Sequence, residues 1–327
     1  MSLEALTDEL EARLPGRVGQ SVPFSELSTY RVGGPVAVLA RVASEDQLAA
    51  VADVAARHRP RLLVVGRGSN LLVGDDGFHG LALLLEGDFE ALALDAASGA
   101  TGDESLVRAG GALALPVLAR RTAAAGFAGL EFFVGIPGSV GGAVRMNAGG
   151  HGRETGDVLR TAWVVDVLAD GERRARTADE LALGYRRSTV TASEVVVAAE
   201  LVVTPDDPTA CEARVAEVVR WRREHQPGGA NAGSVFRNPP GDSAGRLIDA
   251  TGLKGLRVGG AVVSPKHANF FQADAGATAA DVGRLVAEVQ RRVADATGVH
   301  LVPELLMVGE GFEGEVSDGA SVEPSPS

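Results

Sequence analysis

The stretch Arg61-Leu-Leu-Val-Val-Gly-Arg-Gly-Ser-Asn-Leu-Leu72 places a short apolar run directly before a glycine-rich turn. The apolar run predicts a buried strand that ends at Gly66. Upstream, residues 44–58 carry Ser44 and Gln47 at capping-box spacing and apolar residues on one face, so they predict an amphipathic helix. A helix, a buried strand and a glycine loop in this order indicate an α/β arrangement.

The turn that follows this strand is suited to phosphate binding. Successive backbone N–H groups in such a turn form a concavity for phosphate oxygens, and Ser69 and Asn70 add side-chain donors. The turn matches neither the GxGxxG pattern nor a Walker loop, so the common dinucleotide-binding folds are not indicated. A Gly-Ser-Asn turn can also be purely structural, and the turn by itself leaves both interpretations open.

A second glycine-rich segment has the sequence Gly129-Leu-Glu-Phe-Phe-Val-Gly-Ile-Pro-Gly-Ser-Val-Gly-Gly-Ala-Val-Arg-Met-Asn-Ala-Gly-Gly150. Its five glycines from Gly135 to Gly149 and the rigid Pro137 would let the backbone lie flat against a large planar ligand and donate N–H groups to it. The same composition also suits a tight structural crossing. The residues by themselves favour neither the ligand-binding nor the structural interpretation.

Hydrophobic patterning outlines the rest of the chain. Apolar stripes predict two further helices, one from about Thr209 to Arg223 and one from Thr278 to about Thr297 that Gly298 closes. Strand-like runs occur at Leu81–Glu86, Val107–Ala109, Trp163–Leu168 and Val195–Val203. From about Gly311 to Ser327 the chain has little to bury, which predicts a disordered tail.

Composition and charge exclude several classes of function. The 327 residues exceed what one core usually organises, so we expect two or three domains, and the net charge of −12 argues against nucleic acid as a partner. Cys211 is the only cysteine and the six histidines lack ligand spacing, so neither a disulfide nor a metal site is expected. The acidic N-terminus and the absence of a long apolar stretch predict a cytoplasmic protein without membrane insertion.

Basic residues are nevertheless concentrated near one place in the sequence. The only two lysines, Lys254 and Lys266, lie close to Arg246, Arg257 and His267. Such a cluster in an acidic protein suits a small anionic ligand, although a solvated basic loop would have the same composition.

The two glycine-rich segments belong to a longer ordered series of motifs. From about Phe24 to Gly309 this series resembles that of the UDP-N-acetylenolpyruvoylglucosamine reductases. The further motifs are Thr29-Tyr-Arg-Val-Gly-Gly34, Tyr185-Arg-Arg-Ser188, Asn231-Ala-Gly-Ser-Val-Phe-Arg-Asn-Pro239, Ala244-Gly-Arg-Leu-Ile-Asp249, Gly252-Leu-Lys-Gly255, Gly259-Gly-Ala-Val-Val-Ser-Pro-Lys-His-Ala-Asn-Phe270 and Leu301-Val-Pro-Glu304.

The resemblance implies an α+β fold of three domains. A two-domain FAD-binding unit of the vanillyl-alcohol-oxidase type would span residues 1–88 and 89–208, an α+β substrate-binding domain residues 209–310, and the tail residues 311–327. The implied enzyme holds FAD noncovalently, takes hydride from NADPH and reduces UDP-N-acetylglucosamine enolpyruvate to UDP-N-acetylmuramate for peptidoglycan synthesis. We expect a monomer.

The resemblance also assigns a cofactor site. Gly66, Gly68, Ser69 and Asn70 would hold the FAD pyrophosphate together with Gly138, Ser139 and Gly142. Arg67 stands where many members have a small residue, so its contact departs from the family pattern. The other implied cofactor-binding residues are Arg31, Leu71, Gly110, Gly135, Pro137 and Asn147.

The implied catalytic residues are Ser234, Arg186 and Glu304. Hydride addition leaves negative charge on the carbon that bears the carboxylate, so a hydroxyl such as Ser234 can supply the proton and a cation at Arg186 can stabilise the charge. Glu304 could polarise the carboxylate when protonated or orient its neighbours when ionised. On their own, these residues could equally be a turn serine, a surface arginine and a cap.

The implied substrate-binding residues are Tyr185, Arg222, Asn231, Lys254, Lys266 and His267. Tyr185 also suits core packing, and Arg222 lies only near the place where some members have a substrate-contacting lysine. Some members carry an extra loop with a substrate-clamping tyrosine. After Tyr185 this chain contains no tyrosine before Gln226, so it resembles the compact subgroup without that clamp.

Two other functions remain open at this point. One is an oxidase of the same flavin fold; such relatives often bind FAD covalently through histidine or cysteine, and neither glycine loop contains one between Gly66 and Ser69 or between Gly135 and Asn147. The other is a noncatalytic UDP-sugar-binding module, which would carry no flavin absorbance.

Overall fold

An N-terminal sheet carries the first glycine-rich loop. The computed structural model of the protein, which describes residues 2–98 and 104–312, orders the four strands β1 (Val18–Pro23), β2 (Pro35–Val42), β5 (Phe78–Leu85) and β3 (Leu62–Val65). Strand β1 is antiparallel to β2, whereas β2, β5 and β3 are parallel. Helices α1 (Leu3–Arg13) and α2 (Glu45–His58) share a hydrophobic cluster with this sheet. The first glycine-rich loop follows β3 directly.

The start of α2 follows the capping pattern in the sequence. The Ser44 hydroxyl accepts a hydrogen bond from the Gln47 N–H at 3.3 Å, and the Gln47 side chain accepts one from the Ala43 N–H at 2.8 Å. In a capping box the Gln47 side chain would accept from the N–H of Ser44 itself, but here it accepts from the N–H of the preceding residue. Only the bond to the Ser44 hydroxyl therefore follows the capping-box pattern.

A second, antiparallel sheet carries the second glycine-rich segment on one face. Its order is β12 (Arg173–Thr177), β11 (Leu159–Asp166), β13 (Glu194–Pro205), β7 (Ser105–Gly110) and β6 (Leu92–Ser98), with β8 (Phe127–Ala128) paired to the end of β13. Helices α3 (Leu115–Ala124) and α4 (Val140–Met146) pack against this sheet in one cluster. The other face meets α2 and the first sheet through Val165, Val195 and Val197. The first and second units therefore share a core.

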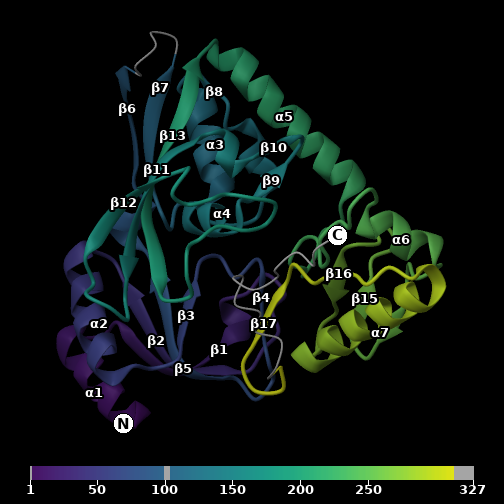
Figure 1. Ribbon diagram of the computed structural model, residues 1–327, viewed down its shortest axis with the longest axis horizontal. Helices are drawn as coiled ribbons and strands as arrows, with labels where there is room; N and C mark the ends of the chain where they lie inside the picture. The colour runs from purple at the N-terminus through teal and green to yellow at the C-terminus, as the bar shows by residue number, and fades with distance from the viewer. Residues whose placement is uncertain (1, 99–103, 313–327) are drawn as a thin grey trace, which may run out of the picture.

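Helix α5 (Pro208–His225) extends from the second unit toward a third (Figure 1). Its Cys211 and Val215 are buried in the cluster of the second unit. The third unit contains α6 (Ala244–Ala250), a small sheet and the long helix α7 (Ala279–Thr297). That sheet is ordered β14 (Arg257–Val258), β15 (Ala261–Val263) and β16 (Phe271–Ala273).

The end of the described chain returns to the first unit. Strand β17 (Leu306–Val308) pairs in parallel with β4 (Leu71–Val73), which directly follows the first glycine-rich loop. Tyr30, Val32 and Leu72 of the first unit are buried in the core of the third. Phe312 also packs against that core. The ordered chain thus continues past residue 310, while residues 313–327 of the expected tail lie outside the described residues.

The expected helices and strands are present, with ends that differ by a few residues. The helices predicted from Ser44, Thr209 and Thr278 are α2, α5 and α7, and the four strand-like runs are β5, β7, β11 and β13. Part of the second glycine-rich segment is helical, because Val140–Met146 form α4. The expected domain boundaries stay a prediction. The boundary expected at residue 208 would assign α5 to the third domain, although the first half of α5 packs into the hydrophobic cluster of the second unit.

Within the described ranges, no helix is both long and apolar enough to cross a bilayer. The same residues contain no group of His, Cys, Asp and Glu side chains that could hold a metal ion.

Candidate active site

The two glycine-rich segments face each other across the junction of the first and second units. A Cβ placed on Gly66 would lie 2.6 Å from the Ser139 Oγ, and one placed on Gly138 would lie 3.5 Å from the Ser69 Oγ. A side chain at residue 66 would therefore require the Ser139 hydroxyl to move. Gly68 has a positive φ of 59°, and a Cβ there would lie 2.0 Å from the Leu27 carbonyl oxygen. Gly66 and Gly138 thus allow the close approach of the two loops, and Gly68 allows the first loop to lie against the backbone of Leu27 and Ser28.

The first loop presents unpaired backbone donors. Within the described residues, the N–H groups of residues 66–69 donate no hydrogen bond. Ser139 opposite is the N-cap of α4, where its Oγ accepts from the Gly142 N–H at 3.4 Å. Free N–H groups and a helix N-terminus both favour phosphate oxygens. The arrangement fits the pyrophosphate of FAD as the resemblance implies.

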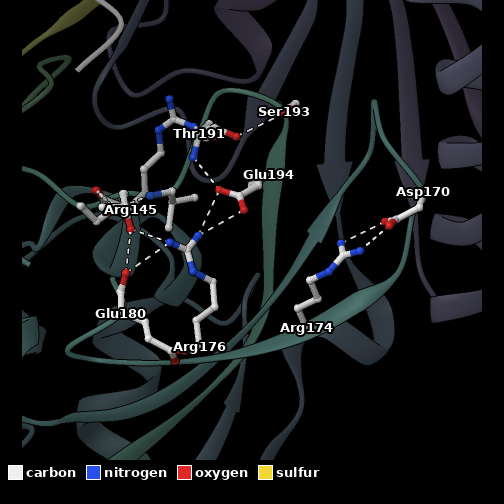
Figure 2. Close-up of polar contacts among 11 residues, drawn as sticks. Arg145, Asp170, Arg174, Arg176, Glu180, Thr191, Ser193 and Glu194 are labelled. Carbon is white, nitrogen blue, oxygen red and sulfur yellow. Dashed lines mark hydrogen bonds and ion pairs between the residues drawn. The ribbon is translucent and has the colours of Figure 1, made fainter. Parts of the chain in front are cut away.

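A cavity of about 270 Å³ adjoins these loops. Its lining comes from β3 and β5 on one side and from β13 and α4 on the other, with Gly66, Arg67, Ser139 and Gly142 at its edge. The charged side chain of Glu194 on its wall is held by Arg176 at 3.1 and 3.3 Å (Figure 2). Arg176 also donates to the Thr189 hydroxyl at 2.5 Å. The lining of the cavity thus combines apolar side chains of β3, β5 and β13 with charged side chains of both signs.

The structure brings Arg186 and Glu304 together. The Arg186 Nε lies 2.7 Å from the Glu304 Oε1, and both side chains are largely buried, with exposed fractions of 18% and 15%. Arg186 has a positive φ of 56° in a short turn in which Gly184 pairs with Arg187. Its other two guanidinium nitrogens donate to the carbonyls of Asn147 at 3.5 Å and Gly149 at 3.3 Å.

Asn147 supports this turn through its own side chain. Its Nδ2 donates to the Gly184 carbonyl at 3.0 Å, and its Oδ1 accepts from the Gly156 N–H at 2.8 Å. The side chain is fully buried. The structure therefore places Asn147, which the sequence assigns to the cofactor, in a bridge that positions Arg186.

Glu304 is fixed by its backbone. Its N–H donates to the Val235 carbonyl at 2.7 Å, and its carbonyl accepts from the Asn70 Nδ2 at 3.0 Å. Burial raises the pKa of the Glu304 carboxyl above its ordinary value, against the lowering effect of Arg186 and, less strongly, Arg237. Asn70 thus connects the first glycine loop to the buried carboxylate.

Ser234 lies on the segment next to Glu304. Ser234 pairs with Phe270, and two residues later Phe236 pairs with Pro303. The side chain of the buried Asn269 holds Phe236 from both sides, accepting from its N–H at 3.0 Å and donating to its carbonyl at 2.8 Å. Within the described residues, nothing hydrogen-bonds to the Ser234 hydroxyl. It is therefore available to a ligand.

Tyr185 is 48% exposed, so the alternative that it packs in the core is wrong. Its hydroxyl accepts a hydrogen bond from the Asn238 N–H at 3.2 Å, which joins the turn of Arg186 to the segment of Ser234.

Arg222 is half-buried and has no polar side-chain partner in the described part of the chain. Burial lowers the pKa of its guanidinium. Burial and the charge of Arg222 together lower the pKa of His151. The His151 ring contacts Trp221 edge to face, with 4.8 Å between the ring centroids. An unpaired, partly desolvated guanidinium is a strong anion receptor.

The basic cluster near Lys254 is already paired with protein groups. Lys254 contacts Asp249 and Arg257 contacts Asp274, each at 2.6 Å, while Arg246 pairs with Asp242. The Lys266 ammonium donates to the Arg223 carbonyl near the C-terminal end of α5. Burial, and then the charge of Lys254, lower the pKa of His267. The structure does not gather these cations into one unpaired patch.

The remaining predicted residues have local structural roles. Asn231 closes its own loop, donating to the Gly229 carbonyl at 3.0 Å and accepting from the Gly233 N–H at 3.1 Å. Gly110 packs against the Phe89 backbone, where a Cβ would lie 2.1 Å from the carbonyl oxygen, and it donates to Ala91. Arg31 is exposed, with φ 57°, and Leu71 begins β4. Gly135 ends a 3-10 turn near His151, and Pro137 lies in the following loop.

Sequence reasoning missed three residues that organise this region. Asn269 clamps the Ser234 segment, Asn238 bonds Tyr185, and Arg237 lies beside Glu304. All three lie inside motifs on which the resemblance is based. Their position in those motifs could have identified them as candidate site residues.

Comparison with known proteins agrees with this geometry. A family model described as a FAD binding domain matches residues 36–175, and a model of the C-terminal domain of UDP-N-acetylenolpyruvoylglucosamine reductase matches residues 225–308. The reductase of Rubrobacter xylanophilus is 42% identical over 290 residues, which cover 88% of this chain and 94% of that protein. The chain belongs to the UDP-N-acetylenolpyruvoylglucosamine reductase family.

Further members of the reductase family match over similar lengths. The reductase of Moorella thermoacetica is 40% identical, with 95% of this chain and 100% of that protein covered. The crystal structure of the Thermus caldophilus reductase has a TM-score of 0.76 and 37% identity, and the match covers 89% of this chain and 98% of that one. The family recognised from the motifs is confirmed, and with it the α+β fold and the class of FAD-dependent oxidoreductase.

Proposed function

We propose that this chain reduces UDP-N-acetylglucosamine enolpyruvate to UDP-N-acetylmuramate, with FAD as cofactor and NADPH as hydride donor, in the cytoplasmic synthesis of peptidoglycan precursors. The observation that carries the proposal is the 2.7 Å pair of Arg186 and Glu304. The pair lies on segments hydrogen-bonded to the first glycine loop and to the Ser234 segment. Family membership supports the same reaction.

The cofactor would be held where the two glycine loops meet. The free N–H groups of residues 66–69 and the N-terminus of α4 at Ser139 suit its phosphates, and Arg67 can add a positive charge. When bound, FAD supplies the group that accepts hydride from NADPH and delivers it to the substrate. Neither loop offers a histidine or cysteine for covalent attachment between Gly66 and Ser69 or between Gly135 and Asn147, so noncovalent binding is expected.

The chain's own residues manage the charge and the proton. Hydride addition to the terminal enol carbon leaves negative charge on the carbon that bears the carboxylate. The positive charge of Arg186 stabilises this charge inside a largely buried site, and the Ser234 hydroxyl supplies the proton. Glu304 positions Arg186 while the pair is intact. When the substrate carboxylate draws on Arg186, burial favours the protonated form of Glu304.

Substrate binding would involve both the turn that carries Arg186 and the segment that carries Ser234. Arg222, whose guanidinium has no partner among the described side chains, is suited to the diphosphate, whereas Lys254 and Lys266 would first have to leave their present partners. The hydrogen bond from the Asn238 N–H to Tyr185 links the two sides of the site. In a chain of the compact subgroup, this contact could serve in place of the clamp tyrosine.

The test is stopped-flow absorbance at the flavin band. NADPH should bleach the purified protein, and the enolpyruvyl substrate should restore the band. In Ser234→Ala, bleaching should keep nearly its normal rate, because that step needs no proton from Ser234. Restoration should slow by roughly 10²–10⁴-fold, the usual effect of a positioned acid. Ser234→Cys should recover part of the loss, since a thiol also donates a proton.

Other outcomes would contradict the proposal. Slower bleaching with normal restoration would place Ser234 at the nicotinamide site. Restoration by oxygen alone would favour an oxidase, and the absence of flavin absorbance would favour a sugar-binding module. The expected monomer is a separate proposal that light scattering after size-exclusion chromatography tests.

A further inference from the structure

The guanidinium of Arg237, beside Glu304 in the proposed active site, has no ion-pair or hydrogen-bond partner among the residues that the structure describes. Its Nε is buried and has no hydrogen-bond partner in the described residues. The side chain makes no ion pair with any described carboxylate either. The Arg237 residue as a whole is only partly buried. A buried N–H without a partner is nevertheless costly, so proteins rarely keep one unless a ligand or water completes its hydrogen bond.

Backbone pairing places Arg237 on the same face as Glu304. The Arg237 N–H donates to the Val302 carbonyl at 2.9 Å, and the Glu304 N–H donates to the Val235 carbonyl at 2.7 Å, on either side of the antiparallel pair Phe236 and Pro303. Side chains alternate along such a pair, so Arg237 and Glu304 share the face opposite Phe236. They are diagonal neighbours, about 7–8 Å apart at Cα, which long side chains can span.

The carboxylate of Glu304 is already committed to Arg186. The Arg186 Nε contacts it at 2.7 Å, and the other two nitrogens of Arg186 donate to backbone carbonyls. Every nitrogen of Arg186 is therefore engaged before any ligand binds. Arg186 can stabilise an incoming anion through its charge, but few of its N–H groups remain to orient one.

The charges on this face do not balance. The two cations that act on Glu304 are Arg186 and Arg237, and Glu304 is the one carboxylate they share. One positive charge is left over. A planar guanidinium matches a carboxylate through two parallel hydrogen bonds, so a substrate carboxylate suits the free guanidinium.

We propose that Arg237 binds the carboxylate of the enolpyruvyl substrate beside Arg186. The proposal rests on the function proposed above and adds a specificity residue to it. Arg237 orients the carboxylate through its free N–H groups, Arg186 stabilises the charge that builds on it, and Glu304 keeps Arg186 in place.

A pair of related nucleotides tests this assignment. UDP-N-acetylmuramate carries the lactyl carboxylate, whereas UDP-N-acetylglucosamine has the same diphosphate without it. In Arg237→Gln, the dissociation constant of UDP-N-acetylmuramate should rise about 10- to 100-fold, the usual effect of losing a hydrogen bond to a charged group. That of UDP-N-acetylglucosamine should stay within about twofold. Isothermal titration of the flavin-loaded protein measures both.

Two further variants keep the experiment interpretable. Arg237→Lys keeps the charge and should recover part of the binding. Arg121→Gln on α3 removes an exposed arginine far along the chain from the site and should leave both affinities unchanged. This variant controls for the loss of one positive charge from a protein whose net charge is −12. A normal flavin spectrum and a normal rate of bleaching by NADPH show that each variant is folded.

Three results would overturn the assignment. Equal weakening of both nucleotides would place Arg237 at the diphosphate. Unchanged affinities in Arg237→Gln together with an altered pH profile of turnover would make Arg237 a positioning residue for Glu304. Unchanged affinities with an unchanged profile would give it no role in binding. If the wild-type protein bound neither nucleotide, the proposed function itself would fail.

Discussion

At the scale of single residues, the site depends on backbone conformations that side chains rarely adopt. Arg186, Asn147 and His151 have positive φ values of 56°, 42° and 54°. Such a conformation costs roughly 1–2 kcal/mol for most residues with a Cβ and less for asparagine, so the surroundings of Arg186 in particular must hold it. Asn147 is held by two side-chain hydrogen bonds, and Arg186 is held by Glu304 and two carbonyls. The ion pair therefore shapes the turn as well as the chemistry.

The ionisation of Glu304 should make the stability of the protein depend on pH. Burial raises the pKa of its carboxyl above the ordinary value of 4.5. A carboxyl with a raised pKa stabilises the folded state below its unfolded pKa, and this contribution is lost as the pH rises through the folded pKa. We therefore expect the unfolding free energy of the wild-type protein to fall relative to that of Glu304→Gln as the pH rises above 4.5. Urea denaturation of both proteins at a series of pH values measures the difference.

The comparison needs a carboxyl that lies in water. Glu217→Gln changes an exposed residue of α5 and should show no such trend with pH. If the wild-type protein instead gained stability relative to Glu304→Gln as the pH rose, the contact with Arg186 would outweigh burial, and the pKa of Glu304 would be lowered.

At the scale of elements, helix α7 is capped both locally and from another unit. Its N-cap Thr278 accepts from the Asp281 N–H at 3.1 Å, and Asp281 accepts from the Thr278 N–H at 3.2 Å. Asp75, from the loop after β4, accepts from the N–H groups of Ala279 and Ala280, both at 2.8 Å. A carboxylate at a helix N-terminus also meets the positive end of the helix dipole. Asp75 thus joins the first unit to the third.

Replacing Asp75 should weaken this junction. Asp75→Ala leaves two helix N–H groups without their acceptor and should lower the unfolding free energy by about 1 kcal/mol, the usual cost of losing a capping side chain. Urea denaturation measures the loss. Asp76→Ala removes the same charge from the neighbouring exposed residue and should change stability little. Equal losses in the two variants would show that charge, and not capping, is responsible.

These elements also show what the sequence can predict. The ends of α2 and α7 could be predicted because Ser44, Thr278 and Gly298 act on residues a few positions away. Helix α4 could not, because its short run Val140–Met146 contains two glycines and is stabilised by burial of Val140, Ala143 and Val144. The pairing of β4 with β17 joins residues 71–73 to 306–308, and no local pattern contains that information.

The same limit applies to the site. The motifs identified Arg186, Ser234 and Glu304 as a set, because each lies in a recognisable family motif. That Arg186 pairs with Glu304, that Asn70 bonds the Glu304 carbonyl and that Asn147 supports the turn of Arg186 are long-range contacts. The sequence carries no local signal for such contacts, so they needed the structure.

At the scale of the whole molecule, the cofactor would connect units that are otherwise separate. The cavity is lined by β3 and β5 of the first unit and by β13 and α4 of the second, and the first glycine loop leads through β4 into contact with the third. A ligand at this junction contacts several units at once. Because it binds the folded state alone, its binding energy adds to the stability of the fold.

Removal of the flavin should therefore lower the melting temperature, and its return should restore it. FAD at about 100 times its dissociation constant adds about 2.7 kcal/mol to the unfolding free energy, which for a protein of this size raises the midpoint by roughly 4 °C. Gly66→Ala should lose part of this rise, because its Cβ would lie 2.6 Å from the Ser139 Oγ and displace that hydroxyl from the N-terminus of α4. Differential scanning calorimetry with and without FAD measures both effects.

Two variants separate the close approach of the loops from a general effect of replacing glycine. Gly66→Ala combined with Ser139→Gly removes the atom that the new Cβ would meet and should recover part of the FAD-dependent rise. Gly228→Ala places a Cβ where no atom lies within 4 Å and should keep the full rise. If Gly66→Ala alone bound FAD as tightly as the wild-type protein, the close approach of Gly66 to Ser139 would not be needed for cofactor binding.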